Sequence, residues 1–326
     1  MKDKMNKILH NRLLWLLILV LFSIYSLTIG VKDFSLLGAI QGNGDDVRLI
    51  LISRLPRLIS ILVTGASLSI AGLIMQTMTQ NKFVSPSTAG TMEWCRFGIM
   101  LAMFFFGGQS TLLKMGTAFL ASLFGTLLFM QVLQKIQFKN NMIVPLVGMM
   151  LGNVVSSITS YVAYKFDMIQ NMSSWLQGNF SLIIKGRYEL LYIGIPFLII
   201  AYLYANKFTI AGMGENFTKS LGVNHKKIVM IGLIIVAVVT STIVVTVGSI
   251  PFIGLIIPNI IAIIKGDNLK NTLPDTAILG AFFVLLCDIL GRVIMFPYEV
   301  PISVIISVLG SVLFLILLFW RKRHAR

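Results

Sequence analysis

The stretch LISRLPRLISILVTGASLSIAG, residues 51–72, determines the fold class of this chain. Arg54 and Arg57 stand near its start, and a run without charged side chains follows as far as residue 81. A helix needs about 20 mostly apolar residues to cross the hydrocarbon core of a bilayer. The run is long enough, so it predicts a membrane-spanning helix that begins beside two arginines.

Similar apolar runs recur along the whole chain. Of its 326 residues, 56% are hydrophobic and only 12% are charged, and the mean hydropathy is +0.88. Soluble domains carry about 25% charged residues. The composition therefore indicates a polytopic membrane protein rather than a soluble domain with a single anchor.

The runs predict an all-α transmembrane bundle of about ten helices, with residues 1–326 as a single transmembrane domain. The expected helices cover residues 13–30, 58–78, 97–107, 113–134, 143–164, 190–206, 228–248, 252–264, 274–295 and 300–320. The 97–107 and 252–264 segments are shorter than the roughly 20 residues of a straight span, so they are either re-entrant or full helices with polar ends inside the protein. The first segment follows basic residues but lacks a small-x-small cleavage site, so we expect it to be retained.

The distribution of Lys and Arg predicts the orientation. With the N-terminus inside, 18 of the 27 basic residues fall on inner segments and nine on outer segments. This bias favours both termini being cytoplasmic, and a count of eight helices would leave them on one side as well. Arg54 and Arg57 then lie on the outer face, where the positive-inside rule does not account for them.

Several functional classes are disfavoured. The net charge of +15 comes from basic residues scattered over short connections, which does not indicate binding of nucleic acid. Cys95 and Cys287 lie far apart in the sequence and predict neither a disulfide framework nor a metal site. All three histidines fall in predicted cytoplasmic flanks, and H-E-x-x-H and G-x-S-x-G motifs are absent from the sequence, which argues against an intramembrane enzyme.

Asp288 is the strongest candidate for a carboxylate within a helix, and Arg292 follows it by one helical turn. Two interpretations remain open: Asp288 is a locally paired or hydrogen-bonded interior residue, or it relays protons in a coupled carrier. The sequence contains no G-x-x-x-x-G-K-[ST] phosphate loop. Active transport would therefore draw its energy from another chain.

Two further stretches differ from simple spans. VTVGSIPFIGLIIPNIIAIIKG (245–266) contains two prolines and several glycines, which is typical of a broken helix that lines a cavity or of closely packed short helices. MGENFTKSLGVNHKK (213–227) lies in a predicted cytoplasmic loop. Its pattern predicts a short surface helix that ends near Gly222.

In this order, the motifs resemble those of permease subunits of type II ATP-binding-cassette importers for iron–siderophore complexes, haem and vitamin B12. The resemblance covers residues 54–320, and the family has ten helices per subunit. The motifs that carry it are RLPR, GASLSIAGLIMQ, GMMLGNVVSS, SSWLQGNF, GENFTKSLGV, GSIPFIGLIIPNI, LPDTAILGAFFVLLCDILGR and EVPISVIISVLGSVLFLILL.

The resemblance implies a set of partners. Two permease subunits, either copies of one chain or two similar chains, pair around a central pathway in the plasma membrane of a bacterium. Two ATPase subunits, which bind ATP and Mg²⁺, dock on the cytoplasmic side, and an extracytoplasmic siderophore-binding protein docks outside. The chain itself would bind no cofactor or metal and would not be an enzyme.

The resemblance also implies residue roles. The residues that match the docking site for acidic side chains of the binding protein are Arg54, Arg57 and Arg292. Those that match the cytoplasmic gate are Asn81, Phe83, Asn140, Asn141 and Met142. Those that match the coupling helix seated in the ATPase are Gly214, Glu215, Leu221, Gly222 and Val223.

We therefore expect a permease that translocates a ferric siderophore, with vitamin B12 or haem as alternative cargo. A stand-alone secondary transporter is the alternative from another class, and it would have no use for a coupling helix. The sequence departs from the family pattern at two places. Asn259 stands where the family often has histidine, and residues 93–96 (EWCR) stand where the family usually has small residues.

Overall fold

A computed structural model describes residues 12–30, 38, 44–86, 90–108, 110–135 and 143–324. These residues form helices, and the only β-pairing among them is an isolated bridge between Gln177 and Ser249. In chain order the helices are α2 (Arg12–Thr28), α4 (Gly44–Leu49), η1 (Ile50–Arg54), α5 (Leu55–Met78), α6 (Thr91–Phe106), α7 (Thr111–Lys135), α8 (Ile143–Lys165), α9 (Ile169–Leu176), η2 (Glu189–Ile193), α10 (Gly194–Leu203), α11 (Ala205–Ala211), α12 (Glu215–Ser220), α13 (His225–Thr246), α14 (Ile253–Lys265), α15 (Leu269–Val293) and α16 (Ile302–His324).

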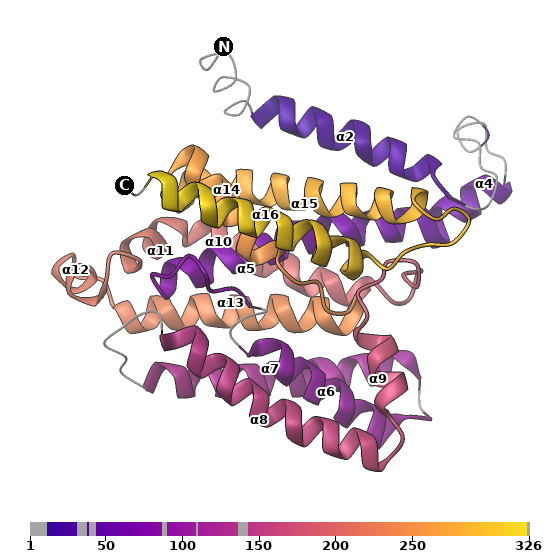
Figure 1. Ribbon diagram of the computed structural model, residues 1–326, viewed down its shortest axis with the longest axis horizontal. Coiled ribbons are helices and arrows are strands. Elements are labelled where there is room, and N and C mark those ends of the chain that lie inside the picture. Colours follow the sequence, from indigo (N-terminus) through magenta and orange to yellow (C-terminus); the bar gives the residue numbers. More distant parts are fainter. Residues whose placement is uncertain are drawn as a thin grey trace.

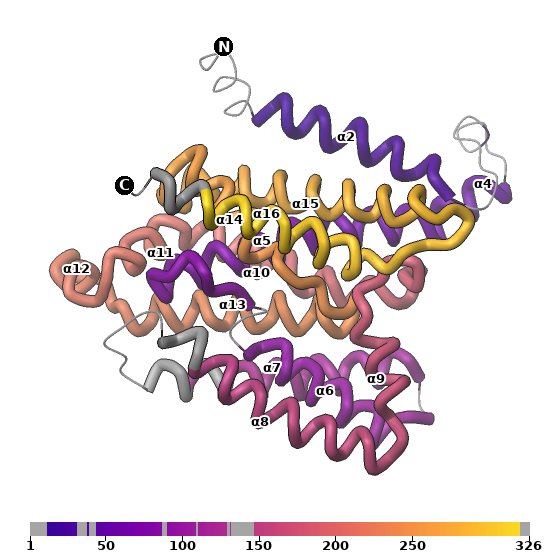
Figure 2. The backbone as a smooth tube through the Cα atoms, viewed as in Figure 1, coloured from indigo at the N-terminus to yellow at the C-terminus, as the bar shows by residue number. Residues whose placement is uncertain are grey.

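The chain runs back and forth between the same two ends of a bundle (Figures 1 and 2). The start of α2, the short helix α12 and the end of α16 lie toward one end. Helices α4 and α9 and the connection from α15 to α16 lie toward the other end. The bias of basic residues assigns the first end to the cytoplasm, and we call the two ends inner and outer.

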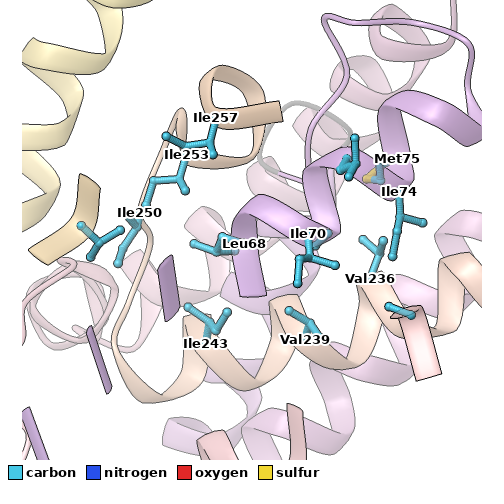
Figure 3. Close-up of a cluster of buried hydrophobic side chains, with 14 of the residues drawn as sticks. Leu68, Ile70, Ile74, Met75, Val236, Val239, Ile243, Ile250, Ile253 and Ile257 are labelled. Atoms are coloured by element: carbon cyan, nitrogen blue, oxygen red, sulfur yellow. The ribbon is translucent and has the colours of Figure 1, made fainter. Parts of the chain in front are cut away.

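Helix α5 forms the centre of the bundle. It packs against α13, α14 and α15, and 78% of the apolar window in the span Gly44–Met78 is buried. Figure 3 shows Leu68, Ile70 and Ile74 of α5 among buried isoleucines and valines of α13 and α14. This helix therefore interlocks with both neighbours through branched aliphatic side chains.

Glycines bring α5 into backbone contact with two of its neighbours. A Cβ atom added at Gly72 would lie 1.9 Å from the carbonyl oxygen of Gly254 on α14. A Cβ atom added at Gly65 would lie 2.4 Å from the carbonyl oxygen of Gly280 on α15. Small residues allow this close approach of helices within a membrane, which explains the glycines of the GASLSIAG stretch.

Each of the ten expected segments contains a helix, but two differ in form. Helix α6 begins at Thr91 rather than near residue 97, because Gly90 adopts a left-handed φ of +82° and Thr91 Oγ1 donates to the carbonyl oxygen of Pro86. Residues 93–96 consequently belong to the helix. The 190–206 segment is bent by 64° between Glu189–Leu203 and Ala205–Ala211.

Within the described residues, five helices are long and apolar enough to cross a membrane, or six if the bent pair counts as one span. Helices α2 and α14 are apolar but shorter. Helix α14 has 13 residues, fewer than a straight span needs, as the sequence predicted. It begins after Phe252, whose φ is +66°, and contains Pro258.

Candidate functional site

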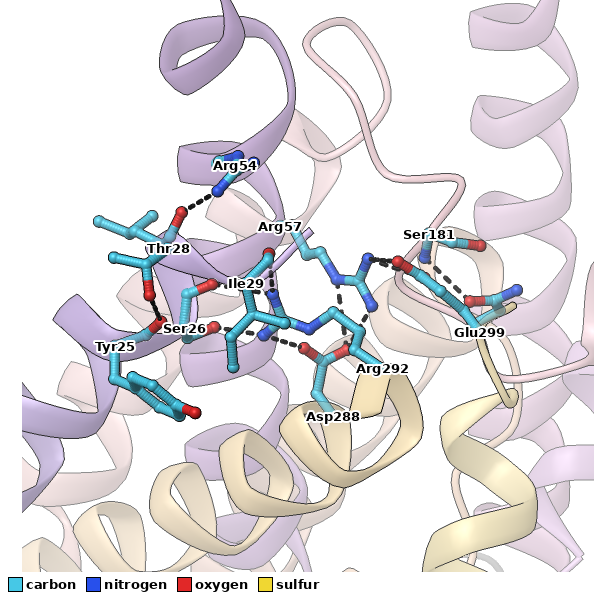
Figure 4. Close-up of polar contacts among 12 residues, drawn as sticks. Tyr25, Ser26, Thr28, Ile29, Arg54, Arg57, Ser181, Asp288, Arg292 and Glu299 are labelled. Atoms are coloured by element: carbon cyan, nitrogen blue, oxygen red, sulfur yellow. Dashed lines mark hydrogen bonds and ion pairs between the residues drawn. The ribbon is translucent and has the colours of Figure 1, made fainter. Parts of the chain in front are cut away.

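At the outer end, two arginines and two carboxylates form a continuous ion-pair network (Figure 4). Arg57, near the start of α5, places Nη2 2.8 Å from Asp288 Oδ1 and Nη1 2.9 Å from both carboxylate oxygens of Glu299. Arg292 Nη2 lies 2.7 Å from Asp288 Oδ2, one turn away on α15. Asp288 thus bridges two guanidinium groups, and Arg57 bridges two carboxylates.

The members of the network differ in exposure. The exposed fraction of the side chain is 2% for Asp288 and 5% for Arg292, but 15% for Arg57 and 24% for Glu299. A buried charge that loses its partner costs several kcal/mol. Asp288 is therefore a fixed member of the network, and Glu299 is the member that solvent or another molecule reaches most easily.

The arginines also hold the end of α2. Arg292 Nη1 donates to the carbonyl oxygens of Ser26 at 2.8 Å and Ile29 at 3.1 Å. Arg54 Nη1 donates to the carbonyl oxygen of Leu27. The last carbonyl groups of a helix have no donor within the helix, so these two guanidinium groups satisfy them and attach α2 to α5 and α15.

A cavity of about 260 Å³ opens beside the network, and we call it the arginine cavity. Its lining includes Arg54, Arg57, Arg292, Ser181 and Glu299. Three guanidinium groups and one carboxylate line the cavity, while Asp288 pairs with Arg57 and Arg292 beneath it and Asp46 attracts Arg54 electrostatically. Guanidinium groups bind carboxylates through paired hydrogen bonds, so the cavity is chemically suited to an acidic side chain.

The structure brings the three sequence-predicted arginines to this one cavity. Sequence reasoning raised the pair of Asp288 with Arg292 as one interpretation, but it missed that Arg57 also pairs with Asp288 and with Glu299. The signal for Glu299 is its place two residues before Pro301, close to the start of α16, in the motif EVPISV. Asp288 pairs with Arg292 on its own helix, as the first interpretation of it requires, and also with Arg57 on another helix.

The predicted gate residues Asn81 and Phe83 lie at the inner end, after α5. Asn81 is buried, and its Oδ1 accepts the backbone N–H of Phe83 at 2.9 Å. The ring of Phe83 meets that of Phe314 on α16 edge to face, with 6.2 Å between centroids. The predicted gate residues Asn140, Asn141 and Met142 lie outside the described residues.

Two further contacts fix the connection that carries Phe83. Asn259 Nδ2 donates to the carbonyl oxygen of Lys82 at 2.8 Å and to that of Leu255 at 2.7 Å. Lys82 pairs with Asp267, which follows α14. The asparagine that departs from the family pattern thus ties the connection to the proline-containing helix α14.

The predicted coupling residues lie at the two ends of α12, at the inner end of the bundle. Gly214 and Gly222 flank the helix with φ values of +104° and +70°, which favour glycine. Leu221 is 52% exposed, whereas Val223 is partly buried against the core. The hydrogen bond from Lys219 lowers the pKa of Glu215.

Sequence reasoning left Phe217 out of this site. Its side chain is 47% exposed on α12, close in sequence to the exposed Leu221, and Met213 before the helix is 58% exposed. Thr218 is buried on the same short helix, and its Oγ1 donates to the Gly214 carbonyl oxygen at 2.7 Å. The helix is thus held by Thr218 and presents large apolar side chains outward.

Apolar helices long enough to cross a membrane, a charged cavity at the outer end and a short protruding helix at the inner end are features expected of a membrane transport permease. The sequence matches the FecCD transport family over residues 15–320, and the chain belongs to this family. The resemblance inferred from the sequence motifs is thereby confirmed.

The chain is also similar to named import permeases and to a solved transporter. The chain is 54% identical to the petrobactin import system permease protein YclN of Bacillus subtilis, over 95% of this chain and 98% of the relative. It is 39% identical to the ferric-anguibactin transport system permease protein FatD of Vibrio anguillarum, over 82% of this chain and 85% of the relative. A solved metal-chelate type ABC transporter in an inward-facing conformation is 28% identical, with a TM-score of 0.80 over 94% of this chain and 97% of the transporter chain.

We expect Asp288→Asn to lower the free energy of unfolding by about 3 kcal/mol, because it leaves two nearly buried guanidinium groups without a shared anion. Thermal unfolding of the detergent-solubilised protein measures this effect. Asp167→Asn removes an exposed carboxylate at the same end and serves as the control. Equal stability of the two variants would contradict a structural role for the network.

Proposed function

We propose that this chain is the membrane-spanning permease subunit of an ATP-binding-cassette importer that carries a ferric siderophore into the cytoplasm of a bacterium. The observation that carries the proposal is the pairing of an arginine cavity at the outer end with an apolar, protruding α12 at the inner end. The 54% identity to a petrobactin permease supports ferric petrobactin as the substrate, in preference to vitamin B12 or haem.

The surface of α8 supports pairing with a second permease subunit. Asn153, Ser157, Tyr161 and Tyr164 recur along one side of this helix, and all four are exposed. Polar side chains rarely face lipid, and in membrane proteins they turn toward other helices or toward water. A second subunit, either a copy of this chain or a similar one, would cover this side of α8 and enclose a polar pathway.

ATP hydrolysis would take place on two partner ATPase subunits, which would hold ATP and Mg²⁺. Helix α12 is the proposed contact with them. Its exposed Phe217 and Leu221 are suited to an apolar groove on a soluble partner. The alternative of a proton-driven carrier is disfavoured because Asp288, its best candidate for a proton relay, is held in two ion pairs.

The arginine cavity is the proposed docking site for an acidic side chain of the extracytoplasmic siderophore-binding protein. Asp288 is too buried to exchange partners, but Glu299 is partly exposed and holds one Arg57 nitrogen. An incoming carboxylate would pair with Arg54 and take over the place of Glu299 on Arg57. Glu299 lies in the connection between α15 and α16, so docking would free this connection from its ion pair with Arg57.

Asn81 and Phe83 would form the inner gate together with Asn140, Asn141 and Met142. The ring contact of Phe83 with Phe314 supports this assignment, because separation of α5 from α16 would open it. The hydrogen bond from Asn259 to the Lys82 carbonyl oxygen would keep the gate connection attached to α14.

We expect Arg54→Glu to abolish radio-iron uptake from ferric petrobactin while membrane insertion and ATPase association remain intact. The added carboxylate would repel the acidic side chain of the binding protein. Arg54 suits this test because reversing Arg57 would also place a third carboxylate beside Asp288 and Glu299. The control Arg48→Glu reverses an exposed charge on α4 and should leave uptake unchanged. Normal uptake by Arg54→Glu would contradict the docking role and indicate that Arg54 only anchors the helix at the membrane interface.

We expect Glu299→Gln to strengthen binding of the binding protein by roughly tenfold, because the incoming carboxylate no longer competes with an internal one. Equilibrium binding to the assembled importer in nanodiscs measures this. Glu189→Gln, which neutralises another exposed outer carboxylate, is the control. Weaker binding by Glu299→Gln would mean that Glu299 positions Arg57 instead of competing for it.

We expect Leu221→Asp to abolish co-purification of the ATPase subunits, because a charge would enter the apolar contact. Leu221→Met keeps an apolar side chain of similar size and should retain the complex. Pull-down from solubilised membranes distinguishes the two variants. Retention of the ATPase by Leu221→Asp would count against α12 as the coupling helix and favour a stand-alone transporter.

A further inference from the structure

A second, larger cavity lies at the outer end. It has a volume of about 470 Å³, within the range of small-molecule sites. The end of α6, the start of α7, helix α9, the end of α13 and part of the 177–187 segment surround it. This cavity is separate from the arginine cavity, and we call it the side cavity.

The side cavity has an apolar floor and a polar rim. Its lining includes Met115, Val245 and Val247, which are 5%, 1% and 3% exposed. Asn171 and Gln177 also line it and are exposed. An apolar floor with a few polar groups at the mouth is the usual construction of a site for an organic ligand.

The charges around the side cavity are cationic. Lys114 and Arg187 line it, and no aspartate or glutamate belongs to its described lining. Among the described residues, neither cation forms an ion pair. The nearby carboxylate of Glu189 accepts the backbone N–H of Gly186 at 2.7 Å. The site is therefore suited to an anion.

An aromatic side chain completes the lining. The indole Nε1 of Trp175 donates to the carbonyl oxygen of Val245 at 2.8 Å, which fixes the orientation of its ring. A fixed ring offers a flat surface to an aromatic or other planar part of a ligand. Cations and an indole together favour an organic anion over a small inorganic one.

The side cavity adjoins the arginine cavity. Ser181 lines the arginine cavity, while Asn179 and Leu182, its near neighbours in sequence, line the side cavity. One short segment thus separates the proposed docking point from the second site. A small molecule released by a docked binding protein would reach the side cavity without crossing the bundle.

We propose that the side cavity binds the ferric chelate as an anion after its release at the outer face, a proposal that rests on the proposed import function. Lys114 and Arg187 would bind the charged oxygen donors of the chelate, and Trp175 would contact its planar part. Chelates of Fe³⁺ with catecholate or carboxylate donors carry a net negative charge, whereas a trihydroxamate chelate is neutral. The site would therefore favour the first kind.

The test is equilibrium binding of radio-iron ferric petrobactin to the purified permease–ATPase complex in nanodiscs, without binding protein. We expect the double variant Lys114→Gln/Arg187→Gln to bind roughly tenfold more weakly than the unaltered complex. The matched control Lys165→Gln/Lys185→Gln removes two exposed outer cations outside the cavity and should bind normally. Lys114→Arg/Arg187→Lys keeps both charges and should retain binding, which separates loss of charge from misfolding.

A ferric trihydroxamate should bind the unaltered complex more weakly than ferric petrobactin. Two results would overturn the side-cavity proposal but not the proposed function. One is equal affinity of Lys114→Gln/Arg187→Gln and Lys165→Gln/Lys185→Gln for ferric petrobactin. The other is no measurable binding of ferric petrobactin to a complex that imports it. Absence of uptake in cells that carry the unaltered protein would instead overturn the proposed function. Weaker docking of the binding protein on Lys114→Gln/Arg187→Gln would assign the cavity to an acidic side chain of that protein, which also contradicts the proposal.

Discussion

Asp288 lies buried inside the outer end of the bundle, where the guanidinium groups of Arg57 and Arg292 share its carboxylate. This pairing determines the positions of several elements at once. Arg57 fixes the start of α5 against α15, and Arg292 satisfies carbonyl groups at the end of α2. The charged residues at the outer face are thus parts of the folded structure before they meet any partner.

The same network adjoins α16, which, like α5, leads from the outer end to the inner gate region. Helix α16 begins shortly after Glu299, which holds Arg57, and farther along it carries Phe314 against Phe83. Only 17% of the apolar window of α16 is buried, so few contacts within the chain restrain it. A change of partners at Arg57 would therefore act on a helix that has room to move relative to α5.

The apolar runs were sufficient to predict the ten apolar helical segments, because length and hydropathy are local properties, but they did not predict the short helices α4 and α9. The outer location of Arg54 and Arg57 followed from a count of charges along the chain. Their partners were not predictable, since Arg57 contacts Asp288 and Glu299 across 231 and 242 residues of sequence. The start of α6 was also not predicted, since it depends on the left-handed backbone conformation of Gly90, which the residue type permits but does not require.

The exposed polar side of α8 has a consequence for the life of the protein in the cell. A solitary subunit would present the side-chain amide of Asn153 to hydrocarbon, where it finds no water to hydrogen-bond, whereas the Ser157 hydroxyl donates to the Asn153 carbonyl oxygen at 2.8 Å. Unassembled copies would then be less soluble in the bilayer than paired ones and would offer quality-control proteases a recognisable surface. Through this helix, the amount of permease that persists in the membrane would follow the supply of its partner subunit.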